Sequence, residues 1–101
     1  MYIYNVTIKL DHSIHTDWIL WMKEVHIPAV MQSGCFTSSK FVRILETDES
    51  DGVTYAAQYF AKTLADYQQY IANHAPALRQ DSLDKWGNKF IGIRTLMQEV
   101  E

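Results

Sequence analysis

The stretch from Trp18 to Phe36 constrains the fold of this chain more than any other. Its apolar residues recur at the spacing of one helix face and include Trp18, Trp21, Met22, Val25 and Ala29. Pro28 then falls inside this pattern, where it removes the hydrogen bond to the carbonyl of Glu24 and crowds that carbonyl. The stretch therefore predicts a helix over about Ile14–Gln32 that kinks or breaks at Pro28.

Four strands are expected around this helix. Apolar and polar residues alternate over residues 2–10, which predicts a half-buried strand. Residues 36–45 and 53–60 read as two more strands, joined by a polar hairpin loop over residues 46–52 that ends in Asp-Gly. A fourth strand is expected over residues 88–97. The strands thus flank two regions that are long enough for helices.

The second of these regions carries its own helix signals. Thr63 and Asp66 have the spacing of a capping box, which marks a helix start. Pro76 interrupts this helix as Pro28 interrupts the first, and Trp86 lies near its end. The order of elements is then β-α-β-β-α-β, which is that of an α+β ferredoxin-like domain with two helices on one face of an antiparallel sheet.

A faint internal repeat supports this order. Residues 26–30 read His-Ile-Pro-Ala-Val, and residues 74–78 read His-Ala-Pro-Ala-Leu. Each phrase is followed by a strand that begins with Lys-Phe, at Lys40 and at Lys89. Such matches are expected because the two halves of this fold are related by a pseudo-twofold axis. We predict a single domain over residues 1–101, as suits the length of the chain.

Composition restricts which binding partners and which cellular compartment are expected. A net charge of −3 disfavours nucleic acids and anionic membranes, because both bind basic surfaces. The lone cysteine, Cys35, cannot form an internal disulfide and is expected to be buried. The N-terminal segment has no basic leader, and no apolar run reaches transmembrane length, so we expect a cytoplasmic protein.

Two helices can cover only one face of such a sheet, so the other face must be open. The face expected to meet the helices comprises Tyr4, Val6, Ile8, Val42, Ile44, Tyr55, Ala57, Tyr59, Ile91 and Ile93. The face expected to be open comprises Ile3, Asn5, Thr7, Phe41, Arg43, Leu45, Ala56, Gln58, Phe60, Phe90, Arg94 and Leu96. This second set is too apolar for solvent, so we expect two sheets to pack together as a homodimeric α+β barrel.

Four polar residues on the predicted open face have two interpretations. Arg43, Arg94, Asn5 and Gln58 either make ordinary hydrogen bonds and ion pairs across the interface or line a pocket for a small anion. In the second case the guanidinium groups would bind a carboxylate or a phosphate.

Two histidines are the candidates for catalysis. His26 and His74 each lie beside a proline break, so each either bonds a freed carbonyl in the core or lines a pocket. Trp21 is either core or pocket wall. The candidate ligand-binding residues are Asn5, Trp21, Arg43, Gln58, Tyr59 and Arg94.

No metal site and no cofactor are predicted. His12 and His15 have the spacing of a weak metal-binding pair, but the sequence places no cysteine and no obvious third ligand near them. The chain also has no glycine-rich nucleotide-binding motif and no G-x-S-x-G motif.

Several phrases together resemble a known family. They are Tyr4-Asn5-Val6-Thr7, Trp18 to Met22 with His26-Ile27-Pro28, Gly52-Val53-Thr54-Tyr55 with Gln58-Tyr59-Phe60, and Ala75-Pro76-Ala77-Leu78-Arg79. The chain is identified on these phrases as similar to a small bacterial family of short proteins whose function is uncharacterised. The resemblance covers nearly the whole chain and implies a dimeric ferredoxin-like domain.

At the level of fold the chain is also similar to the antibiotic-biosynthesis and haem-degrading monooxygenases. This resemblance implies that Asn5, on the first strand, and His74, on the second helix, match haem-site residues of the haem-degrading members. Those members also have a tryptophan on the third strand, where this chain has Tyr55 and Tyr59.

Three hypotheses follow. The first is a homodimer that binds a small anionic or aromatic molecule, with or without cofactor-independent catalysis. The second is a haem-binding or haem-degrading protein, and the third is a non-catalytic structural or regulatory dimer. The sequence leaves open whether the protein is an enzyme and what it binds.

Overall fold

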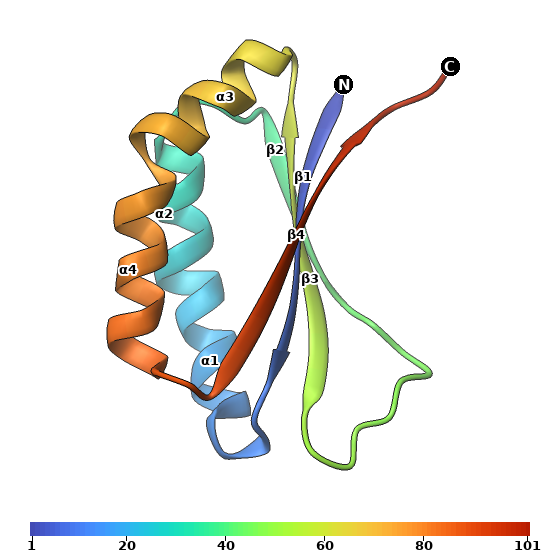
Figure 1. The fold of residues 1–101 in the computed structure, drawn as a ribbon, viewed down its shortest axis with the longest axis vertical. Coiled ribbons are helices and arrows are strands. Elements are labelled where there is room, and N and C mark those ends of the chain that lie inside the picture. The colour runs from blue at the N-terminus through green and yellow to red at the C-terminus, as the bar shows by residue number, and fades with distance from the viewer.

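The computed structural model describes residues 1–101 and has the predicted order of elements (Figure 1). Strands β1 (Tyr2–Leu10), β2 (Ser38–Arg43), β3 (Val53–Ala61) and β4 (Phe90–Gln98) form one antiparallel sheet in the order β2-β3-β1-β4. All helices lie on one face of this sheet, and the other face is uncovered (Figure 1). The α+β ferredoxin-like fold is thereby confirmed.

The first helical segment is not one regular α-helix but a series of four short helical elements. It consists of η1 (His12–Ile14), α1 (His15–Trp21), η2 (Met22–His26) and α2 (Ile27–Gln32). The element η2 is a π-helical turn, at whose end the amide of Ile27 donates to the carbonyl of Met22. The expected kink at Pro28 therefore takes the form of a π turn just before the proline, which has no amide hydrogen to continue the regular α-helical pattern.

The second helical segment is divided where the sequence predicted. It consists of α3 (Leu64–Asn73) and α4 (Ala75–Trp86), which are separated by His74, two residues before Pro76. The hydroxyl oxygen of Thr63 accepts a hydrogen bond of 3.1 Å from the amide of Asp66, so the predicted N-cap is present.

Replacing Thr63 by alanine is expected to lower the free energy of unfolding by about 1 kcal/mol, because the amide of Asp66 loses its partner. Thr63→Ser keeps the hydroxyl and should remain within a few tenths of a kcal/mol of the parent. Urea unfolding of the three proteins measures the difference. Equal stability of the alanine and serine variants would show that this cap contributes nothing.

The strand register corrects the predicted faces of β2 and β4. Paired residues of antiparallel strands point to the same face, and Val6, which faces the helices, pairs with Arg94. Arg43 likewise pairs with Tyr55, whose ring lies in the core. Both arginines are therefore on the helix side of the sheet, and their prediction for the open face was wrong. The faces of β1 and β3 are as predicted.

The open face differs in composition from the predicted one: it lacks both arginines, gains Val42, Ile91 and Ile93, and also carries Lys9 and Lys40. It consists of alternate residues of the four strands and includes Ile3, Asn5, Thr7, Val42, Ala56, Gln58, Phe60, Ile91 and Ile93. Ile91 and Ile93 are each 65% exposed. Exposed apolar side chains clustered on one face of a sheet are typical of an interaction surface.

The core lies between the sheet and the helices. Trp18 is nearly fully buried and packs against the rings of Phe41 and Tyr55. Cys35 is also buried, as expected. None of the helices combines the length and apolar character needed to cross a bilayer.

Candidate functional site

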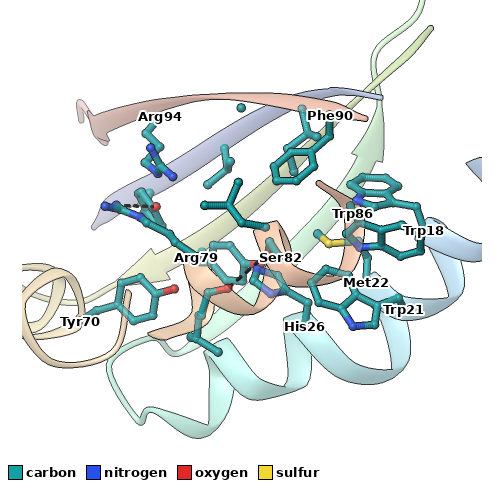
Figure 2. A pocket seen from close by; sticks show the side chains of 17 residues that line it. Trp18, Trp21, Met22, His26, Tyr70, Arg79, Ser82, Trp86, Phe90 and Arg94 are labelled. Carbon is teal, nitrogen blue, oxygen red and sulfur yellow. Dashed lines mark hydrogen bonds between the residues drawn. The ribbon is translucent and has the colours of Figure 1, made fainter. Parts of the chain in front are cut away.

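A cavity of about 150 Å³ lies between the sheet and the helix layer (Figure 2). Seventeen residues line it, and twelve of them are hydrophobic. All three tryptophans of the chain are among them, and in Figure 2 they gather with Phe90 at one end, while Arg79 and Arg94 lie at the other. The cavity therefore has an aromatic end and a basic end.

The π turn helps to build the aromatic end. Trp21 precedes this turn and His26 closes it, so the two residues are five positions apart. Their rings stack at a centroid distance of 4.9 Å and an angle of 25°. In a regular α-helix the residues four apart are aligned, whereas the wider π turn brings residues five apart onto one face. The ring of Trp86, from α4, completes this cluster: its centroid is 5.8 Å from that of Trp21, and the two rings are nearly perpendicular.

The basic end carries two arginines without acidic partners. Of the three arginines in the chain, only Arg43 forms an ion pair, at 3.1 Å from Glu49 and outside the cavity. Arg79 and Arg94 line the cavity, and no aspartate or glutamate lines it. The cavity is thus positively charged in a chain whose net charge is −3. Such a concentration of unpaired guanidinium groups favours an anionic ligand.

Three buried polar groups at the cavity have no hydrogen-bond partner. They are the hydroxyl of Tyr59, the Nε of Arg79 and the indole Nε1 of Trp86. No other fully buried side-chain nitrogen or oxygen in the molecule is unpaired. An unpaired buried donor costs about 1–3 kcal/mol, so such groups are rare without a functional reason. Their gathering around one cavity indicates a ligand with hydrogen-bond acceptors.

The orientation of Arg79 is set by a neighbouring strand. Its Nη2 donates to the hydroxyl of Tyr4 at 3.4 Å, a bond visible in Figure 2. Burial raises the pKa values of Tyr59 and Tyr70 well above their usual range, so both hydroxyls stay protonated at neutral pH. The basic end therefore presents guanidinium and hydroxyl groups, with no competing negative charge.

His26 differs from the other polar residues of the cavity. Burial lowers its pKa from 6.5 to about 4, against a smaller opposing effect of Asp81. The imidazole is therefore neutral at physiological pH and has a nitrogen that can accept a hydrogen bond.

The structure brings together four of the residues predicted from the sequence. Trp21, His26, Tyr59 and Arg94 all line this cavity. Arg94 was expected on the open face. It reaches the cavity because it lies on the helix side of the sheet.

The other predicted residues lie elsewhere. Asn5 and Gln58 are on the open face, where Gln58 donates to Asn5 at 3.2 Å. Arg43 lies at the end of β2 with its ion-pair partner Glu49. The predicted open-face pocket of Asn5, Gln58, Arg43 and Arg94 is therefore not formed.

His74 does not line the cavity and packs instead against the ring of Tyr70. It lies in the helix layer, whereas Asn5 is on the opposite side of the sheet. Asn5 and His74, the two residues that match haem-site residues of the haem-degrading enzymes, therefore do not lie in one site.

His12 and His15 also have separate surroundings. A ring nitrogen of His12 is 2.6 Å from the carbonyl oxygen of Glu49, and one of His15 is 2.7 Å from the hydroxyl of Tyr55. No group of three or more metal-ligating side chains is gathered anywhere in the molecule.

Two important cavity residues, Arg79 and Trp86, were missed by the sequence analysis. Both are on α4, where Ala75, Arg79, Ser82 and Trp86 recur every three or four residues. This spacing places Arg79 on the apolar face of the helix, and an arginine on such a face is a signal that could have been used.

Comparison with known proteins identifies a family but no activity. The family model described as "Domain of unknown function (DUF4286)" matches residues 1–100. No curated protein matches the sequence significantly. The predicted resemblance to a family of uncharacterised function is thereby confirmed.

Several solved structures share the fold at low sequence identity. An ethyl tert-butyl ether d (ethd) family protein from Bacillus halodurans is 14% identical with a TM-score of 0.69, over 99% of this chain and 100% of that one. SnoaB, a cofactor-independent oxygenase from Streptomyces nogalater, is 9% identical with a TM-score of 0.62, over 99% and 94%. A dimeric ferredoxin-like protein from an uncultured marine organism is 17% identical with a TM-score of 0.57, over 98% and 97%. At these identities the similarity concerns the fold alone.

Proposed function

Because this chain belongs to DUF4286, a domain family of unknown function, we propose a function from its own cavity: the protein binds a small aromatic organic anion there. The observation that carries this proposal is the make-up of the cavity wall. It combines three tryptophans with two arginines that have no acidic partner.

The size of the cavity supports a ligand with a single aromatic ring. A dry cavity of about 150 Å³ is known to hold benzene, and this cavity has the same volume. The walls formed by Trp21, Trp86 and Phe90 offer ring faces and edges, against which another ring packs favourably.

The basic end supports a negative charge on that ligand. A carboxylate placed between Arg79 and Arg94 would accept charge-assisted hydrogen bonds from both guanidinium groups. It would also give the unpaired Nε of Arg79 the partner that the protein alone does not supply. Arg94 is exposed, so it lies where the ligand would enter from solvent.

We further propose that the protein acts as a homodimer in the cytoplasm, with two copies packed through the open face. The exposed Ile91 and Ile93 and the exposed Val42 give this face the apolar character of an interface. A protein of the same fold is described as a dimeric ferredoxin-like protein. The free thiol of Cys35 suits the reducing conditions of the cytoplasm.

Benzoate is the simplest probe of the proposed site. Calorimetric titration is expected to show binding with a dissociation constant of roughly 1 mM or below, as is usual for a ligand of this size. Arg79→Gln and Arg94→Gln should each weaken binding by about tenfold or more, because each removes a charge-assisted contact.

Arg43→Gln is the matched control, since it removes an arginine outside the cavity and should leave benzoate affinity unchanged. Acetate, which has the carboxylate without the ring, should bind far more weakly than benzoate. Absence of benzoate binding, or equal losses in all three arginine variants, would contradict the proposed function.

A further inference from the structure

We infer that the ligand of this cavity is an aromatic acid that also carries a ring hydroxyl, and that His26 is the residue that selects for this hydroxyl. This assignment rests on the proposed binding of an aromatic anion. It adds the second functional group of the ligand and the residue that recognises it.

The first observation is an imbalance between donors and acceptors around the cavity. The guanidinium groups of Arg79 and Arg94 and the indole of Trp86 can only donate hydrogen bonds. No aspartate, glutamate, asparagine or glutamine lines the cavity. The lining hydroxyls of Tyr4, Tyr59, Tyr70 and Ser82 can both donate and accept. The neutral His26 ring is the lining group with a nitrogen that carries no hydrogen and can only accept.

The second observation is that this acceptor is free. The hydrogen bonds of histidine side chains in the molecule are those of His12 and His15, and His26 makes none. The ring of His26 is held by stacking on Trp21, which fixes its plane and leaves its edge available. A partly buried acceptor that is held in place and unpaired fits a hydrogen-bond donor on the ligand.

The groups around His26 leave its imidazole neutral at neutral pH, so it remains a hydrogen-bond acceptor. Asp81 is the acidic group that acts on His26, while Arg79, Arg94 and the protonated hydroxyls of Tyr59 and Tyr70 line the same cavity. The effect of burial exceeds that of Asp81, so the imidazole stays neutral and cannot pair with a carboxylate. The carboxylate is then directed to the arginines, and the hydroxyl to His26.

The position of the two groups also restricts where the hydroxyl stands on the ring. Arg94 comes from β4 in the sheet, and His26 comes from η2 in the helix layer, so they lie on opposite walls of the cavity (Figure 2). A ligand that reaches both walls needs its carboxylate and its hydroxyl on separated ring positions. An ortho hydroxyl is directed back toward the carboxylate and would not reach His26.

Four probes and three variants test this assignment by calorimetry. The probes are benzoate and its 2-, 3- and 4-hydroxy derivatives, and the variants are His26→Phe, His26→Gln and His74→Phe. The parent protein should bind the 3- or the 4-hydroxy derivative at least fivefold more tightly than benzoate, which is the usual value of one added hydrogen bond. The 2-hydroxy derivative should gain nothing.

His26→Phe keeps a ring against Trp21 but removes the acceptor, so the ratio of its affinities for the hydroxy derivatives and for benzoate should fall to about one. His26→Gln restores an acceptor oxygen and should recover part of the preference. His74→Phe changes the equivalent residue of the internal repeat, which is outside the cavity, and should behave like the parent.

The outcomes separate this inference from the proposed function. If benzoate does not bind the parent protein, the proposed function fails and this assignment fails with it. If benzoate binds through the two arginines but no hydroxyl derivative binds more tightly, or if the preference survives in His26→Phe, only the role of His26 is overturned.

Discussion

Replacing Ile91 and Ile93 together by lysine is expected to convert the proposed homodimer into monomers. Each side chain is 65% exposed on the open face, so the single subunit should tolerate the change. In a symmetric dimer the two substitutions add four positive charges to the interface at its exposed isoleucines, and each buried charge costs several kcal/mol. We expect the dissociation constant of the dimer to rise by about a thousandfold or more, as measured by sedimentation velocity.

Val25→Lys is the matched control for this experiment. Val25 is 52% exposed, but it lies in η2 within the helix layer, away from the open face. Its substitution should leave the dimer intact. A parent protein that sediments as a monomer, or a double lysine variant that still sediments as a dimer, would contradict the proposed interface.

The second large effect is a loss of stability in mild acid that originates at His26. The pKa of this residue is about 4 in the folded protein, because of burial, and about 6.5 in the unfolded chain. As the pH falls below 6.5 the imidazole becomes protonated in the unfolded chain, whereas in the folded protein it stays neutral until about pH 4. The free energy of unfolding should therefore fall by about 3 kcal/mol between pH 6.5 and pH 4 through this group alone.

Urea unfolding of the parent protein and of His26→Phe at several pH values measures this contribution. The variant has no group to protonate at this position, so its stability should depend less steeply on pH in that range. Below about pH 4 the two proteins should again change in parallel. Equal pH dependence of the parent and the variant throughout would show that His26 is not buried as a neutral group.

The order of the elements was predictable because each carries a local signal. The alternation over Tyr2–Leu10, the cap at Thr63 and the two prolines each act within a few residues. The sheet order β2-β3-β1-β4 then follows from the ferredoxin-like pattern as a whole.

The faces of the two edge strands were not predictable in the same way. In β4, Ile91 and Ile93 are apolar in one phase, while Phe90 and Leu96 are apolar in the other. Alternation therefore fits both assignments, and only the pairing with β1 decides between them. That pairing places Arg94 beside the helices and leaves the two isoleucines exposed.

The candidate site was predictable in its residue types but not in its position. The combination of arginine, histidine and aromatic residues led to the prediction of an anionic or aromatic ligand, which remains a prediction. The alignment of Trp21 with His26 depends on a π turn, which the sequence showed only as a disturbance at Pro28. The lack of a partner for the Nε of Arg79 is a property of the packed structure that no local pattern reveals.

The most direct test of the proposed site is a titration with 4-hydroxybenzoate followed by ¹H–¹⁵N correlation spectroscopy. The unpaired Nε1 of Trp86 and Nε of Arg79 each carry a hydrogen that such a spectrum can observe. We predict that both resonances shift and saturate together, while the side-chain amide of Gln58 on the open face does not move. If the Trp86 and Arg79 resonances stay in place at millimolar ligand, the cavity is not the binding site and the proposed function is wrong.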